Sequence, residues 1–210
     1  MRKIFVLLLA SLMLVSAMLA FTSCGEEPAV YSDYVALEIE NYGTIVIELY
    51  KLMAPGTVYN FQKLVSQGFY DGLTFHRIVP GFMIQGGDPM GNGSGGSSET
   101  IYGEMMSNGF KQNTLKHTPG VVSMARSSSG YNTASSQFFI MTETNPNLDG
   151  EYAAFGKVVE GMDVVEAISK TATDLSETDS WGTPIGGKPL TPVKITKAYF
   201  VENYVPVAES

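Results

Sequence analysis

The stretch FHRIVPGFMIQGGD, residues 75–88, holds two short apolar runs that a Pro-Gly pair joins. Arg77 lies within the first run, and Gln85 directly follows the second. Side chains of a β-strand point alternately to its two faces, so Phe75, Arg77 and Val79 are predicted to share one face. A plain core strand would carry apolar side chains at the positions of Arg77 and Gln85.

The later stretch SQFFIM has the same alternation, which places Gln137, Phe139 and Met141 together. Arginine, glutamine and large apolar side chains on shared faces are typical of a ligand-binding groove, which is mostly apolar with a few placed polar groups. The alternative is that Arg77 pairs with an acidic residue in the interior and has only a structural role.

Short strands and two helices make up the rest of the pattern. VALEIENYGTIVIELY, residues 35–50, alternates on both sides of a turn and predicts a β-hairpin. Apolar spacing predicts helices at 55–68 and 162–169. Further strands are predicted at 74–79, 82–85, 121–125, 137–141, 154–159 and in PVKITKAYFVE near the end. Many short strands without βαβ alternation indicate a mainly β protein, with a closed or nearly closed antiparallel sheet capped by helices.

Composition excludes several classes of function. The chain has 210 residues, of which 44% are hydrophobic and 16% charged, so one domain with a sizeable core is expected. The net charge of -8 argues against a nucleic-acid partner.

The Gly-rich stretch at 91–98 lacks the lysine of a phosphate-binding loop and is expected to be a connection with positive φ angles. His76 and His117 have no partners at metal-ligand spacing, so no metal site is predicted.

The N-terminus reads as an export signal. Residues 1–23 begin with two basic residues and continue as an apolar run, typical of a signal peptide; the alternative is an uncleaved membrane anchor. The only cysteine, Cys24, ends the segment AFTSC, which resembles the lipobox of bacterial lipoproteins, with Phe21 in the place of the usual Leu. This resemblance implies a lipidated Cys24 that anchors the protein to the bacterial cell membrane, outside the cytoplasm; the alternative is an incidental or buried thiol. Residues 24–34 are predicted to be a tether and 203–210 a C-terminal tail.

FHRIVPGFMIQGGD, IYGE, LKHTPGVVSMA, SQFFI and LDGEYAAFGKVVEGMDVVEAI together resemble the cyclophilin family of peptidyl-prolyl cis-trans isomerases. The resemblance covers residues 35–202, with the blocks in the family's order. It implies a closed eight-stranded antiparallel barrel capped by two α-helices. It also implies a monomeric isomerase, without cofactor or metal, that acts on proline-containing polypeptides and assists the folding of exported or surface proteins.

The resemblance also implies which residues form the site. Arg77 matches the family's catalytic arginine, and Gln85 and Phe82 are predicted to act with it. The predicted substrate-binding residues are His76, Met83, Ala125, Gln137, Phe139, Leu148 and Tyr152.

Two positions depart from the family's best-known members. Asn147 stands where those members have Trp, and Tyr152 where they have His, both at the edge of the proline pocket. Tyr152 still offers a ring and a hydroxyl to a substrate. Loss of the aromatic wall at Asn147 is expected to weaken cyclosporin binding.

Rotation about an X-Pro bond breaks no σ bond and costs amide resonance of about 18–20 kcal/mol, so no nucleophile is needed. A guanidinium at Arg77 can stabilise the prolyl nitrogen as it becomes pyramidal. A binding module that holds proline-containing segments with little turnover is the alternative function. The segment 171–192 is longer than a turn requires, and its sequence indicates no function.

Overall fold

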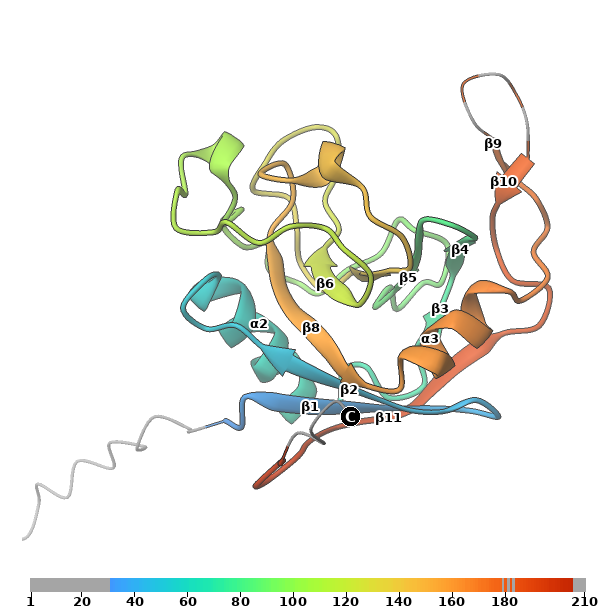
Figure 1. Ribbon diagram of the computed structural model, residues 1–210, viewed down its shortest axis with the longest axis horizontal. Coiled ribbons are helices and arrows are strands. Elements are labelled where there is room, and N and C mark those ends of the chain that lie inside the picture. Colours follow the sequence, from blue (N-terminus) through green and yellow to red (C-terminus); the bar gives the residue numbers. More distant parts are fainter. Residues whose placement is uncertain (1–30, 179, 181, 183, 206–210) are drawn as a thin grey trace, which may run out of the picture. The chain divides into compact units, whose positions relative to one another are not determined.

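The computed structural model describes residues 31–178, 180, 182 and 184–205 (Figure 1). The predicted signal peptide, Cys24 and the first part of the predicted tether, to residue 30, lie outside the described residues, as do residues 206–210 of the predicted tail. Within the described part of the chain, no helix combines the length and the apolar character needed to cross a membrane.

The main sheet has nine antiparallel strands. The predicted hairpin is present as β1 (Tyr34–Ile39) and β2 (Gly43–Leu49). The remaining strands of this sheet are β3 (Thr74–Phe75), β4 (Arg77–Val79), β5 (Met83–Gly86), β6 (Val121–Met124), β7 (Phe138–Met141), β8 (Ala154–Glu160) and β11 (Val193–Phe200). They are ordered β3-β11-β1-β2-β8-β6-β7-β5-β4. A separate two-stranded sheet consists of β9 (Glu177–Thr178) and β10 (Pro184–Gly186).

The chain itself closes the barrel. β3 and β4 are at opposite ends of the strand order, yet only His76 separates them in sequence. The main chain at His76 therefore joins the two edges of the sheet. The predicted barrel is confirmed, and the count of nine strands instead of eight arises because the predicted strand at 74–79 is broken at this residue.

The break at His76 also interrupts the alternation of side chains. Arg77 and Val79 share a face as predicted, but the prediction that Phe75 joins them is wrong. The ring of Phe75 lies in the main core, with its centroid 6.0 Å from that of Phe138. Alternation holds only within a continuous strand, so it cannot be carried across the corner between β3 and β4.

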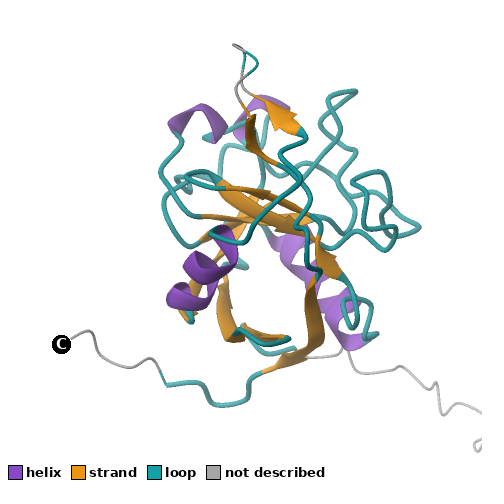
Figure 2. Ribbon diagram, turned by 90° about the vertical axis from the view of Figure 1, so that its right-hand side faces the viewer, coloured by secondary structure: helices purple, strands orange, loops and turns teal. Residues whose placement is uncertain are grey.

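Two helices cover the barrel from opposite sides (Figure 2). They are α2 (Pro55–Ser66) and α3 (Met162–Ser169). The buried carboxylate of Glu104 accepts hydrogen bonds from the backbone N–H groups of Gly56 (2.9 Å) and Thr57 (2.8 Å) in the first turn of α2. A negative charge is favourable there because the first N–H groups of a helix lack helical partners.

Alternation along the strands separates two apolar clusters. The main core lies inside the barrel and includes Ile78, Ile84 and Ile140 together with apolar residues of both helices. The second cluster is formed by the intervening residues on the other face of the same strands. Its buried members are Val79, Met83, Val121, Phe139, Met141 and Ala154.

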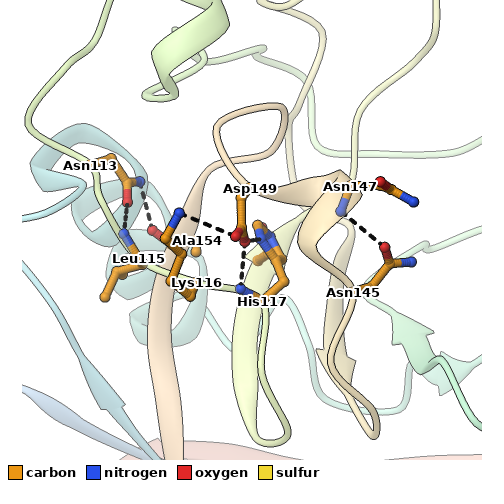
Figure 3. A network of polar contacts seen from close by, with 9 residues as sticks. Asn113, Leu115, Lys116, His117, Asn145, Asn147, Asp149 and Ala154 are labelled. Atoms are coloured by element: carbon orange, nitrogen blue, oxygen red, sulfur yellow. Dashed lines mark hydrogen bonds and ion pairs between the residues drawn. The ribbon is translucent and has the colours of Figure 1, made fainter.

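A polar network joins Asp149 to His117 and Lys116 (Figure 3). Asp149 accepts hydrogen bonds from the backbone N–H of His117 (2.8 Å) and pairs with its ring Nδ1 (3.2 Å) and with Lys116 (3.3 Å). The other ring nitrogen of His117 lies 3.1 Å from the hydroxyl of Ser123. Serine, histidine and carboxylate in this order are found in acyl-transfer enzymes, but His117 is 1% and Ser123 0% exposed. A substrate cannot reach them, so the network is structural.

Burial sets the protonation of this network. It lowers the pKa of His117 below the ordinary value of 6.5, although Asp149 works in the opposite direction. Burial also lowers the pKa of His76. For Asp149, burial alone would raise the pKa, but the hydrogen bonds from His117 outweigh it, and the pKa falls below 3.8.

Acidification is expected to destabilise the fold in two stages. Below pH 6.5 the unfolded chain takes up protons that His117 and His76 resist in the fold, so the unfolding free energy falls as the pH falls. Each histidine contributes at most about 1.4 kcal/mol per pH unit. The contribution of Asp149 is present above 3.8 and is lost only below it. Urea unfolding between about pH 7.5 and 5.5 measures the histidine stage.

His117→Gln is the matched variant, because it keeps a donor and an acceptor but cannot titrate. Its unfolding free energy should depend less steeply on pH than that of the unmodified protein. An equal slope in both proteins would show that burial does not keep His117 neutral.

Candidate active site

The register of three neighbouring strands brings the predicted polar residues together. In the pairing of β4 with β5, Arg77 lies opposite Gln85 and Val79 opposite Met83. In the pairing of β5 with β7, Gln85 lies opposite Phe139. Side chains directly opposite each other share a face, so the arginine, the glutamine and the phenylalanine form one row across the sheet.

These side chains line a cavity of about 270 Å³ beside the second apolar cluster. Its walls combine an apolar surface with a guanidinium and an amide. The lining residues are Arg77, Phe82, Met83, Gln85, Ala125, Arg126, Phe139, Leu148 and Tyr152. The structure therefore brings together eight of the residues that the sequence predicted for the site.

A directional chain of hydrogen bonds orients the polar wall. Gln137 donates through its amide nitrogen to the carbonyls of Gly95 (2.7 Å) and Gly93 (3.0 Å) in the Gly-rich loop. Its oxygen accepts from the amide of Gln85 (2.9 Å). The oxygen of Gln85 in turn accepts from Nη1 of Arg77 (3.3 Å). Because a guanidinium can only donate, this order fixes both amide orientations.

The Gly-rich loop can fold closely around Asp88 because it has no side chain at Gly95. Gly91 and Gly93 have φ angles of 61° and 85°, as was expected of a connection with positive φ. A Cβ at Gly95 would lie 2.1 Å from a carboxylate oxygen of Asp88. Asp88 itself accepts hydrogen bonds from the backbone N–H groups of Asn92 (3.0 Å) and Gly93 (2.6 Å) and so anchors the loop.

Phe139 forms the apolar base of the cavity. Its ring is 5% exposed and lies between two other rings. His117 stacks behind it at 6.0 Å with an interplanar angle of 20°, and Tyr152 meets it edge-on at 5.7 Å and 84°. The buried His117 on one side and the half-buried Tyr152 on the other keep the Phe139 ring in one orientation, so the cavity has a preformed apolar surface.

Three residues singled out by the sequence lie elsewhere. His76 is buried and lines a neighbouring cavity of about 470 Å³, which shares Arg77 and Gln85 with the first. Gln137 supports the polar wall but is not among the residues that line the apolar cavity. Asn147 is exposed in the short 3-10 helix η2 (Pro146–Leu148), where its backbone N–H donates to the side chain of Asn145.

Sequence reasoning missed Arg126, which lines the cavity. Its guanidinium carbon lies 4.8 Å from the ring centroid of Tyr152 and 5.1 Å from that of Tyr131. Its Nε donates to the backbone carbonyl of Glu151 (3.1 Å). A cation over an aromatic face is favourable, and here it stabilises one wall of the cavity. No spacing in the sequence links Arg126 to Tyr152, because the contact forms between separate loops.

Glu177 was missed as well. Its carboxylate oxygens lie 3.2 Å from Nε and 3.3 Å from Nη2 of Arg77. The alternative prediction for Arg77 is an acidic partner in the interior. The partner found here is a residue of β9 at the edge of the groove, 38% exposed, and Arg77 is 30% exposed beside it.

The arrangement can hold a small apolar ring next to a fixed cation and an amide. In the described part of the chain, no group of three or more His, Cys, Asp or Glu side chains could hold a metal ion. The cavity walls carry neither a cysteine nor a serine as a nucleophile. The groups present suit binding and charge stabilisation, in which no bond to the protein forms.

Comparisons with known proteins indicate one family for this chain. The family model described as "Cyclophilin type peptidyl-prolyl cis-trans isomerase/CLD" matches residues 34–200. "Peptidyl-prolyl cis-trans isomerase ppi1" of Schizosaccharomyces pombe is 45% identical over 157 residues, which are 74% of this chain and 92% of the relative. "Peptidyl-prolyl cis-trans isomerase B" of Bacillus subtilis is 47% identical over 131 residues, 62% of this chain and 87% of the relative.

A solved structure is similar as well. It is a cyclophilin type peptidyl-prolyl cis-trans isomerase of Cryptosporidium parvum, crystallised in the presence of the dipeptide Ala-Pro. The TM-score is 0.70 at 33% identity, and the match covers 81% of this chain and 99% of the other. The chain therefore belongs to the family of cyclophilin-type peptidyl-prolyl cis-trans isomerases.

Proposed function

We propose that this isomerase binds the proline ring of a polypeptide in the cavity above Phe139 and twists the X-Pro bond beside Arg77. The observation that carries the proposal is the hydrogen-bond chain that ends at Arg77, next to a cavity of about 270 Å³ whose base is the ring of Phe139. Phe82, Met83, Phe139 and Leu148 supply apolar surface for the ring, and Ala125 and Tyr152 complete the wall.

In the twisted state the prolyl nitrogen becomes pyramidal and gains a lone pair. The guanidinium of Arg77 stabilises this state more than either planar state, because it can donate a hydrogen bond to the lone pair. Gln85 donates one amide hydrogen to Gln137, so its second amide hydrogen can bind the substrate carbonyl as it turns. A hydrogen bond from a charged group contributes about 1.5–3 kcal/mol, which corresponds to a rate factor of roughly ten to a few hundred.

We further propose that the protein acts outside the cytoplasm, held on a bacterial cell membrane by lipid on Cys24. The basic start, the apolar run and the cysteine at its end support this location. Two or three acyl chains anchor a protein stably, whereas one binds reversibly. Exported and surface proteins that fold in that compartment are then the natural substrates.

Arg77→Ala is expected to lower kcat/KM for a proline-containing peptide by about ten-fold to a few hundred-fold, because the twisted state loses a charged hydrogen bond. Isomer exchange measured by NMR gives the rate, and circular dichroism checks the fold. Arg77→Lys is the matched variant. It keeps the positive charge but loses the planar guanidinium, which contacts Gln85 and Glu177 at the same time. An unchanged rate in a folded Arg77→Ala protein would rule out the proposed role.

Cys24→Ser is expected to move the protein from the membrane fraction to the soluble fraction, because no acyl chain can then be attached. Fractionation of cells that express each form, with a labelled fatty acid as a second readout, checks this. Ser11→Thr, a small change outside the AFTSC segment that keeps the cysteine, is the control. A Cys24→Ser protein that stays in the membrane at its full, uncleaved mass would favour an uncleaved anchor.

A further inference from the structure

The segment 171–192, to which the sequence assigned no function, returns to the site after α3. Within it, β9 pairs with β10 in antiparallel register, with Thr178 opposite Pro184 and Glu177 opposite Gly186. Figure 1 shows this hairpin projecting from the side of the barrel where β4 lies. The cavity of about 470 Å³ that contains His76 lies between the hairpin, β4 and the Gly-rich loop.

Main-chain contacts dock the hairpin next to Arg77. The N–H of Ile78 donates to the carbonyl of Gly187 (2.8 Å), and the N–H of Gly187 donates to the carbonyl of Ile78 (2.9 Å). A Cβ at Gly186 would lie 2.2 Å from the carbonyl oxygen of Ile78, so a residue without a side chain is needed there. The residue that follows Arg77 is thus bonded directly to the hairpin.

Asp174 holds the base of the hairpin together. Its carboxylate accepts hydrogen bonds from the backbone N–H groups of Ser176 (3.1 Å) and Lys188 (3.0 Å). Its own N–H donates to the carbonyl of Lys188 (2.9 Å). The two bonds with Lys188 cross between the arms close to Glu177, and the bonds between Ile78 and Gly187 join the hairpin to β4, so backbone contacts set the position of Glu177 relative to β4.

The two oxygens of Glu177 bind one edge of the Arg77 guanidinium, at Nε (3.2 Å) and Nη2 (3.3 Å). Nη1 contacts Gln85 (3.3 Å) and the sulfur of Met83 (3.7 Å). An arginine side chain has five N–H hydrogens. The contacts above, all with described residues, use four of them and leave one Nη2 hydrogen for a substrate. The 30% exposure of the Arg77 side chain keeps the guanidinium within reach.

We propose that Glu177 is a positioning residue, which holds the guanidinium of Arg77 in the orientation that stabilises the twisted X-Pro bond. This inference rests on the proposed role of Arg77. The carboxylate also offsets part of the charge of the guanidinium, but both groups are partly exposed and water screens that effect. The larger effect of Glu177 is then to order the long side chain of Arg77, because an arginine without partners samples many rotamers.

Glu177→Gln and Glu177→Ala are expected to lower kcat by about ten-fold with little change in KM, because orientation of Arg77 matters in the twisted state more than in binding. NMR exchange over a range of peptide concentrations separates kcat from KM in the purified full chain. Thr178→Ala, on the same strand, and Glu143→Gln, an equal change of charge at an exposed site, are controls that should leave both constants unchanged. Hydrogen exchange at the Ile78 and Gly187 amides shows whether the hairpin stays docked.

The decisive measurement repeats Glu177→Gln in an Arg77→Ala background, where a positioning residue has nothing left to position. The substitution should then have no further effect on the rate. An equal loss in both backgrounds would show that Glu177 acts through the hairpin, and an unchanged or faster rate in the single variant would show that it does not assist Arg77. Each of these results overturns the inference.

The single variants also separate this inference from the proposed function. A slow Arg77→Ala protein with a fully active Glu177→Gln protein would overturn only the role of Glu177. An Arg77→Ala protein with a normal rate would overturn both.

Discussion

The hydrogen bond between Nη1 of Arg77 and the side-chain oxygen of Gln85 is the contact on which the groove depends. It forms because the two residues lie opposite each other on β4 and β5. The oxygen of Gln85 is available only because its nitrogen donates to Gln137, whose nitrogen is in turn taken up by the carbonyls of the Gly-rich loop. The Gly-rich loop carries no catalytic group, yet through Gln137 and Gln85 it helps to orient the guanidinium of Arg77.

The two faces of the same strands have different roles: one packs into the core, and the other forms the groove. Ile78, Ile84 and Ile140 fill the barrel, and their neighbours in sequence build the groove on the other face. A sheet with apolar side chains on both faces needs cover on both, and here the helices cover one face and the long loops line the other. The buried ring of His117 supports the groove face, because it stacks on the ring of Phe139 and is itself held by Ser123.

How much could be predicted from the sequence depends on the distance over which a pattern acts. Both helices, the hairpin and the other strands of the main sheet were predicted within a few residues, since their periodicity is local, but β9 and β10 were not predicted. Phe75 was assigned to the wrong face because one broken position, His76, resets the alternation. Arg126 and Glu177 were missed because each reaches the site from a loop or hairpin whose path depends on contacts with distant strands.

The sequence by itself determined the barrel, the family and most of the groove. Alternating strands, helix signals and long ordered motifs are all patterns among neighbouring residues, so they can be recognised without the structure. The sequence also indicated export through its first 24 residues, which lie outside the described structure. Only the tertiary structure decided what surrounds Arg77: Gln85 across the strand pair, and Glu177 from the hairpin that docks on Ile78. The reason is that strand register and loop docking arise from long-range pairing, and a residue one hundred positions away in sequence carries no local signal of it.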